Sequence, residues 1–252
     1  MSVKVLVLRG DGLNCENETA FAFSKHGATC SIVHVNDLLE NKKLLLEHDI
    51  FVVPGGFSFG DDLGSGRVLS LKLKMGLKEE LTQFAKEERP ILGICNGVQV
   101  LMKMGLLPDK KFVQSATLDK NIDGKFINKW SDLVVNSELC KWVPSELKSV
   151  TMPIRHGEGR FIFSDSSVAN EIVTNNQAVF TYKSNPNGST HDIAGICDPS
   201  GTILGLMPHP EAAIDTNSTP LGIDSSNDTN IIFHTILKYV TERKSNEFKS
   251  IN

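Results

Sequence analysis

The chain has 252 residues, of which 40% are hydrophobic and 22% charged, a composition typical of soluble globular proteins. Its 26 basic and 30 acidic side chains give a net charge of −4, which argues against a protein that binds nucleic acid through a generally basic surface. The longest apolar runs are far shorter than the roughly 18 residues of a membrane-spanning helix. We therefore expect no contact with nucleic acid or membrane, and no secretory signal at the N-terminus.

The five cysteines are odd in number and far apart in the sequence. They are Cys15, Cys30, Cys95, Cys140 and Cys197. This spacing fits neither a disulfide framework nor a four-ligand zinc site. We therefore expect free thiols in the reducing cytoplasm and no bound metal.

The first hundred residues alternate between strand-like and helix-like patterns. The predicted strands are 3–8, 30–35, 50–53 and 91–94, and the predicted helices are 16–26, 38–47, 77–86 and 98–104. Strands that are apolar throughout and alternate with helices indicate a parallel sheet covered by helices on both faces.

The second half is richer in short strands separated by turns. Strand-like segments occur at 133–135, 150–154, 160–163, 178–182, 193–196 and 203–206. We expect them to extend the sheet in antiparallel fashion, before a last helix at 230–243 and a frayed tail at 244–252. The pattern thus predicts one α/β domain over 1–252, with a flavodoxin-like mixed sheet, and leaves the place and role of the stretch 110–149 open.

One cysteine lies at a sharp turn between a predicted strand and a predicted helix. Cys95 has glycines two residues away on either side, at Gly93 and Gly97, as a nucleophile elbow requires. The start of the helix favours a thiolate, and the N–H of Asn96 is placed to face an oxyanion. A buried core cysteine is the common alternative, but the glycine spacing favours a nucleophile.

A cysteine nucleophile needs a base, and the base needs a group to orient it. His209 and Glu211 are two residues apart in a proline-rich segment that we expect to be extended, with both side chains on the same side. Glu211 could then accept a hydrogen bond from one ring nitrogen and leave the other for Cys95. A chance pair on a surface turn, a zinc site, and His156 as the base are the alternatives.

A glycine-rich segment follows the third predicted strand, where open α/β sheets bind ligands. Gly55, Gly56 and Phe57 could bring main-chain N–H groups close to a substrate carbonyl and complete an oxyanion hole. An ordinary flexible loop is the alternative. No phosphate-binding or dinucleotide-binding glycine motif is present.

Together these segments resemble the class I (triad) glutamine amidotransferases, and most closely the branch that serves purine biosynthesis. The similarity extends over about residues 3–240. It is carried by RGDGLNC (9–15), PGGFSFGD (54–61), GICNGVQ (93–99), IRHGEGRF (154–161), NPNGS (185–189) and GLMPHPE (205–211).

The resemblance implies a glutaminase that works through a cysteine thioester. Cys95 would attack the side-chain amide of glutamine, His209 would protonate the departing ammonia and then activate water, and Glu211 would hold His209. N–H groups near Gly56 and Asn96 would stabilise the oxyanion.

The resemblance also implies residues that bind glutamine. Gln99 lies one helical turn after Cys95 and should face the same side. His156, Gly157 and Glu158 resemble a glutamine-binding loop.

A glutaminase alone would waste ammonia, and the chain has no recognisable nucleotide-binding motif. The resemblance therefore implies a larger synthetase subunit that binds ATP and Mg²⁺ and receives ammonia along a protected path. This chain would hold no cofactor and would be slow alone, and the sequence leaves a small third subunit open. A cysteine hydrolase or peptidase, a non-catalytic regulatory subunit and a subunit serving another acceptor are alternatives.

Overall fold

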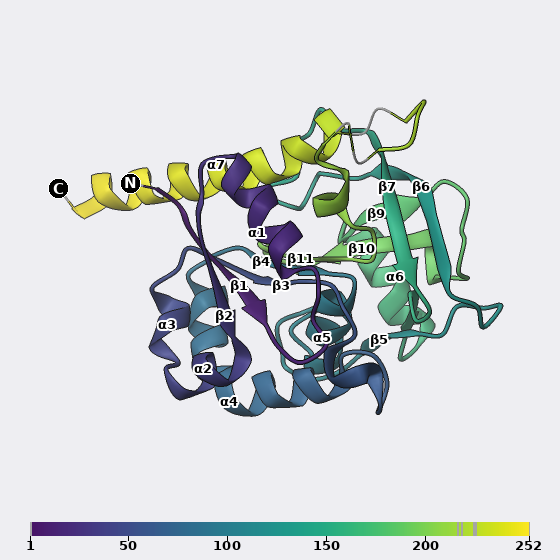
Figure 1. The fold of residues 1–252 in the computed structure, drawn as a ribbon, viewed down its shortest axis with the longest axis horizontal. Coiled ribbons are helices and arrows are strands. Elements are labelled where there is room, and N and C mark those ends of the chain that lie inside the picture. The colour runs from purple at the N-terminus through teal and green to yellow at the C-terminus, as the bar shows by residue number, and fades with distance from the viewer. Residues whose placement is uncertain (1, 216, 218, 224–225, 252) are drawn as a thin grey trace.

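The computed structural model describes residues 2–215, 217, 219–223 and 226–251. Its main element is a nine-stranded mixed sheet (Figure 1). In spatial order the strands are β2 (Thr29–His34), β1 (Lys4–Arg9), β3 (Ile50–Val53), β4 (Ile91–Ile94), β11 (Ile203–Leu206), β10 (Ile193–Cys197), β9 (Ala178–Tyr182), β6 (Ile127–Val135) and β7 (Ser149–His156). A smaller antiparallel pair is formed by β5 (Ala116–Asp119) and β8 (Arg160–Phe163).

Helices cover both faces of the parallel part of the sheet. They are α1 (Glu16–Lys25), α2 (Val35–Glu40), α3 (Lys43–Leu46), α4 (Arg67–Lys86), α5 (Asn96–Met104) and α7 (Ser226–Ile251), while α6 (Ser166–Thr174) lies beside β8. Figure 1 shows α1 and α7 on one face and α2, α3, α4 and α5 on the other. The strands β3, β4 and β11 are buried at every residue because helices exclude water from both sides.

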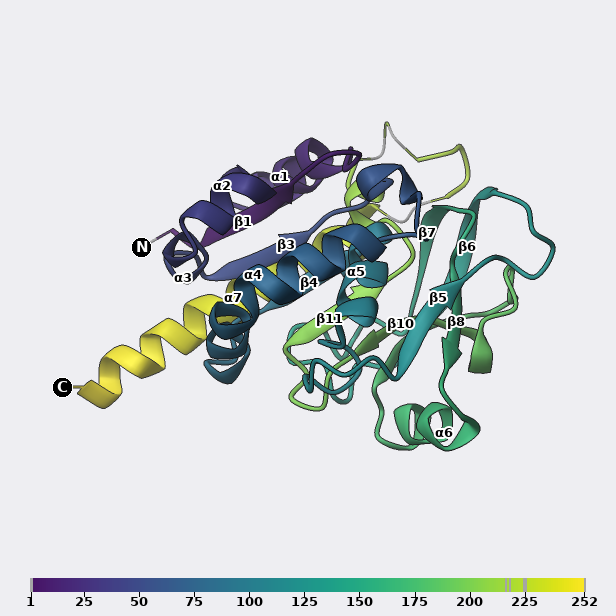
Figure 2. The same cartoon turned by 90° about the horizontal axis from the view of Figure 1, so that it is seen from below.

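The expected mixed α/β fold is confirmed, with two corrections to the strand pairing. The strands β2, β1, β3, β4 and β11 run parallel in the flavodoxin-like order, and β10, β9, β6 and β7 continue the sheet in antiparallel fashion. The segment 203–206, expected in the antiparallel part, instead pairs parallel with β4. The segment 160–163, also expected there, leaves the sheet and pairs with β5, a strand that the sequence pattern missed (Figure 2).

Two helix predictions had the wrong bounds. The segment 38–47 forms two short helices, α2 and α3, rather than one. Helix α4 begins at Arg67, well before the predicted start at 77, and continues through Gly76. A Cβ at Gly76 would lie 2.2 Å from Cδ2 of Leu39, so the glycine serves close packing of α2 on α4 rather than ending the helix.

The C-terminal helix is longer than the sequence pattern predicts. It continues to Ile251, where a frayed tail was expected from Lys244, and residue 252 lies outside the described residues. Nζ of Lys244 lies 2.6 Å from Oδ2 of Asp49, and the Arg243 guanidinium donates to the carbonyl of Glu87. These contacts hold the helix against the sheet at the point where fraying was expected.

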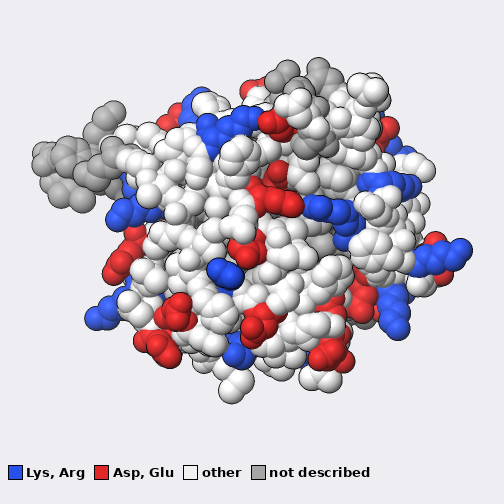
Figure 3. All heavy atoms as spheres, viewed as in Figure 1, with Lys and Arg blue, Asp and Glu red and all other residues white. Residues whose placement is uncertain are grey.

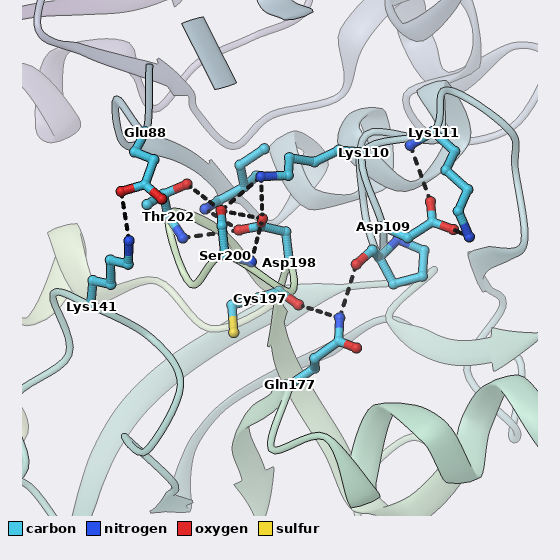
Figure 4. A network of polar contacts seen from close by, with 12 residues as sticks. Glu88, Asp109, Lys110, Lys111, Lys141, Gln177, Cys197, Asp198, Ser200 and Thr202 are labelled. Carbon is cyan, nitrogen blue, oxygen red and sulfur yellow. Dashed lines mark hydrogen bonds and ion pairs between the residues drawn. The ribbon is translucent and has the colours of Figure 1, made fainter. Parts of the chain in front are cut away.

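The stretch 110–149, whose place and role the sequence left open, is tied to the turn between β10 and β11 by a buried carboxylate. Asp198 is fully buried and pairs with Nζ of Lys110 at 2.9 Å (Figure 4). It also accepts hydrogen bonds from the N–H groups of Ser200 and Ile203. Burial alone would raise the pKa of Asp198, but these hydrogen bonds and Lys110 outweigh it and hold the pKa below its usual value. This network fixes the start of β11, which leads to the candidate site.

Candidate active site

Cys95 occupies the strained turn between β4 and α5. Its backbone has φ 51° and ψ −106°, and its N–H donates to the carbonyl of Leu206 at 2.8 Å. A Cβ at Gly97 would lie 1.9 Å from the carbonyl oxygen of Val53, and one at Gly93 would lie 2.7 Å from Leu101. Only glycine therefore fits at these two positions, which is the elbow geometry that the spacing predicts.

His209 and Glu211 meet immediately after β11. Nδ1 of His209 lies 2.6 Å from Oε1 of Glu211, and both side chains are buried. The sequence suggested that this segment is extended. In the structure a 3₁₀ turn, Pro210–Ala213, begins directly after His209 instead. Since β11 lies parallel to β4, the histidine and Cys95 follow neighbouring strand ends.

The electrostatics of this pair favour a charged imidazole. Burial lowers the pKa of His209, but the Glu211 carboxylate and the thiols of Cys95 and Cys15 more than offset this and hold the pKa well above its usual value. Among the described residues, Nε2 of His209 has no hydrogen-bond partner. With Nδ1 engaged by Glu211, Nε2 is the ring atom that remains for proton transfer.

Two adjoining cavities, of about 160 and 140 Å³, meet at Cys95. Both are bordered by Gly56, Phe57, Cys95, Phe126 and Arg155. The first also contacts Asn14, Cys15, Asn128 and His209, and the second also contacts Asp61, Ser65, Gln99, His156, Gly157 and Glu158. The thiol of Cys95 lies 3.7 Å from the carbonyl oxygen of Arg155. The predicted catalytic and substrate-binding residues thus line these cavities, except for Gly55, Asn96 and Glu211. Those three contact residues that line them.

The three residues of the predicted oxyanion loop have different surroundings. A Cβ at Gly55 would lie 2.9 Å from Cε1 of His209 and 3.5 Å from Cβ of Cys95, so Gly55 makes room for these two side chains. Gly56 borders both cavities. The N–H of Phe57 donates to the carbonyl of Gly12 at 2.8 Å, so this N–H is not available to a substrate, whereas its ring is about half exposed at the cavity mouth.

Asn96 and Gln99 form a buried chain of hydrogen bonds behind Cys95. Nδ2 of Asn96 donates to Oε1 of Gln99 at 2.8 Å, and Nε2 of Gln99 donates to the carbonyl of Glu158. The side-chain amide of Gln99 is therefore engaged by protein at both ends, and it supports the 156–158 loop. The N–H of Asn96 lies in the first turn of α5, where main-chain donors have no partner within the helix.

His156 is a buried neutral residue rather than a second base. Its Nδ1 lies 3.0 Å from Oδ1 of Asn121, and burial, with His209 nearby, lowers its pKa to about 4. The side chain of Asn121 also donates to the carbonyl of His156 and accepts from the N–H of Gly159. Asn121, which no sequence pattern indicated, thus holds the 156–158 loop together with Gln99.

The low pKa of His156 predicts a loss of stability in mild acid. The unfolded chain takes up a proton near the ordinary pKa of 6.5, whereas the folded protein does so only near 4. The contribution of His156 to the free energy of unfolding is therefore complete above pH 6.5 and is lost as the pH falls toward 4. The loss amounts to about 2 kcal/mol between pH 7 and pH 5. In His156→Gln that loss should disappear from urea-unfolding free energies. His234→Gln, at an exposed position of α7, should keep the wild-type pH dependence, and an equal slope in all three proteins would contradict the assignment.

Cys15 was not among the sequence-predicted site residues, although its segment carried part of the family resemblance. Among the described residues, Cys15, His209 and Glu211 form the one group whose thiol, imidazole and carboxylate atoms, within 4.8 Å of one another, could hold a metal ion. Because Nδ1 of His209 already donates to Glu211, the arrangement suits acid–base chemistry as it stands. The absence of a bound metal remains a prediction.

Comparisons with known proteins agree with this geometry. The family model described as a CobB/CobQ-like glutamine amidotransferase domain matches residues 2–240, and the chain belongs to this family. It is thus a glutamine amidotransferase, an enzyme that takes nitrogen from glutamine, and the expected family is confirmed.

Individual relatives are similar over most of their length. Phosphoribosylformylglycinamidine synthase subunit PurQ from Methanococcus maripaludis is 42% identical over 86% of this chain and 85% of its own. The protein of the same name from Dehalococcoides mccartyi is 37% identical over 95% and 98%. A chain in the structure titled PurLQS from Thermotoga maritima has a TM-score of 0.76 and 31% identity, over 95% of this chain and 100% of that one.

The surface charge and the helices bear on the expectations from composition. On the face seen in Figure 3, acidic and basic side chains are interspersed rather than gathered into one basic patch. Within the described ranges, none of the helices combines the length and apolar character needed to cross a membrane.

Proposed function

We propose that the chain is the glutaminase subunit of phosphoribosylformylglycinamidine synthase, which supplies ammonia for one step of purine biosynthesis. The observation that carries the proposal is the buried His209–Glu211 pair beside a cysteine in a strained turn at the junction of two cavities. The two relatives named as subunits of that synthase support the choice of acceptor.

The proposed reaction proceeds through a thioester. His209 takes the proton of the Cys95 thiol, and the sulfur bonds to the side-chain carbonyl carbon of glutamine while the N–H groups of Gly56 and Asn96 stabilise the oxyanion. His209 then protonates the amide nitrogen, the C–N bond breaks, and ammonia leaves. The same ring next takes a proton from water, which attacks the thioester to release glutamate and regenerate the thiol. Glu211 keeps the ring oriented and stabilises its positive charge.

We place the amino-acid end of glutamine in the second cavity. Its wall carries the carboxylates of Asp61 and Glu158, which suit an α-ammonium group. Both are fixed by the chain around Ser65, since the Ser65 N–H donates to Glu158 and its hydroxyl donates to Asp61. Gln99 and His156 act here mainly by positioning this loop.

The synthetase partner would cover the cavity mouth. Phe57 and Phe126 lie there with ring centroids 6.4 Å apart, and both rings are about half exposed. An apolar rim around an ammonia-releasing site is suited to a dry contact that keeps ammonia from solvent. We propose that ATP and Mg²⁺ bind to that partner, that a small third subunit can join the complex, and that the complex works in the cytoplasm, where the five free cysteines stay reduced.

Reconstitution with the synthetase tests this function. Glutamine hydrolysis should rise at least about tenfold when the synthetase, ATP and the formylglycinamide ribonucleotide are added, because docking completes the site. Ammonium chloride should replace the chain as nitrogen source. Equal hydrolysis with and without the synthetase would contradict coupling. Hydrolysis stimulated only by a synthetase for a different acceptor would contradict the choice of pathway.

A further inference from the structure

We propose that residues 12–15, which connect β1 to α1, are a positioning element for the oxyanion site: they fix the direction of the Gly56 N–H. This inference rests on the proposed function, because the oxyanion is the one formed when Cys95 attacks glutamine. It assigns a role to a segment whose side chains take no part in the proposed reaction steps.

The two segments pair side by side like short antiparallel strands. The N–H groups of Asn14 and Cys15 both donate to the carbonyl of Gly55, each at 3.2 Å. In the other direction, the N–H of Phe57 donates to the carbonyl of Gly12 at 2.8 Å. Gly56 lies between these bonds and forms an antiparallel bridge with Leu13.

This pairing determines where the Gly56 N–H points. In a trans peptide, the N–H of one residue points away from the carbonyl of the residue before it. The carbonyl of Gly55 faces the N–H groups of Asn14 and Cys15, so the N–H of Gly56 faces the opposite edge. Because Gly56 borders the two cavities that meet at Cys95, its N–H is positioned to point into them.

The contact is too close for side chains. A Cβ at Gly12 would lie 2.0 Å from the carbonyl oxygen of Phe57, and a Cβ at Gly56 would lie 2.6 Å from the carbonyl oxygen of Gly12. Gly12 also has φ +84°, which favours glycine. Any residue larger than glycine at position 12 must therefore displace the Phe57 main chain. We expect this displacement to turn the Gly56 N–H, which lies one residue before Phe57.

The same segment also reaches the base. The thiol of Cys15 is the second sulfur near His209, and a Cβ at Gly55 would lie 3.2 Å from it. Residues 12–15 therefore connect the oxyanion donor and the catalytic histidine through one short piece of backbone. Displacing it should affect the transition state more than glutamine binding, since the proposed glutamine-binding carboxylates lie in the other cavity.

Gly12→Ala tests the proposal, with Gly27→Ala as a matched control. Gly27 has φ +88°, and a Cβ there would meet nothing within 4 Å, so its variant reports the cost of the left-handed backbone alone. In Gly12→Ala we expect kcat for glutamine hydrolysis to fall about 100-fold with KM changed less than about threefold. Gly27→Ala should keep the wild-type kcat and KM.

Two probes of Cys95 separate positioning from general damage. The aldehyde analogue of glutamine forms a tetrahedral adduct with the thiol and needs the oxyanion donors, whereas iodoacetamide needs only the thiolate. Gly12→Ala should weaken aldehyde inhibition about 100-fold and leave the iodoacetamide rate within about twofold of the wild type. Equal losses with both probes, or a Gly12→Ala enzyme indistinguishable from Gly27→Ala, would overturn the proposal.

Amide exchange in the unmodified protein gives a test that does not depend on whether Gly12→Ala folds. The N–H groups of Asn14, Cys15 and Phe57 should exchange slowly in the free protein, and that of Gly56 should become protected only when the aldehyde binds. Rapid exchange at Asn14 and Cys15 would overturn the inference while leaving the glutaminase function standing. A wild-type protein without glutaminase activity in the reconstituted complex would instead overturn the function.

Discussion

Cys95→Ser should lower glutamine hydrolysis by about 10³-fold or more. The serine hydroxyl fits the same turn but ionises far less readily than a thiol, so no thioester forms and the oxyanion site has nothing to stabilise. Ammonia-dependent synthesis by the reconstituted complex should continue, because that half of the reaction belongs to the partner. The measurement is product formation with glutamine and with ammonium chloride as alternative nitrogen sources.

Cys30→Ser provides the matched control. Cys30 is a partly buried thiol on β2 that donates to the carbonyl of Ala20, away from both cavities. This variant should support synthesis with either nitrogen source at the wild-type rate. If Cys95→Ser retained glutamine-dependent synthesis, another group would have to be the nucleophile. If it lost the ammonia-dependent reaction as well, its defect would lie in assembly of the complex.

The parallel half of the fold could be predicted because its signals are local. The runs at β3 and β4 are short, apolar and bounded by Pro54 or Cys95, and each was placed within its observed bounds. The direction of β11 could not be predicted in the same way. Its four apolar residues fit an antiparallel or a parallel neighbour equally well, and the choice depends on where the chain returns to the sheet after β10.

In the candidate site, too, the residues that belong to local sequence patterns could be predicted, and those that act through distant parts of the chain could not. Glycine spacing indicated Cys95, and the spacing of His209 and Glu211 suggested a pair, since each of these patterns lies within a few residues. Asn121 could not be found, because it acts on the 156–158 loop from a different strand connection 35 residues away in the chain. For Gln99, helical spacing gave the correct side of α5. It could not show that the side-chain amide of Gln99 is already hydrogen-bonded to Asn96 and to the carbonyl of Glu158.

Glu211→Gln should have the second largest effect. The carboxylate of Glu211 is buried and accepts from Nδ1 of His209, so it both orients the ring and raises its pKa. A neutral amide keeps the shape but removes the charge that stabilises the imidazolium formed during thioester formation. We expect kcat for glutamine hydrolysis to fall by about 10²–10⁴-fold, with a much smaller change in KM.

The same variant should change the titration of the histidine in a direction that the structure fixes. Without the carboxylate, burial prevails and the pKa of His209 falls, so in NMR titrations its ring should lose its proton at a lower pH than in the wild type. Asp49→Asn removes another buried carboxylate, which accepts a hydrogen bond from the N–H of Lys4. Asp49 lies just before β3, whereas the candidate site lies after the end of that strand. It should leave both kcat and the His209 titration unchanged. A Glu211→Gln enzyme that lost activity while its histidine titrated normally would show that Glu211 acts on orientation alone, and that the raised pKa of His209 has another source.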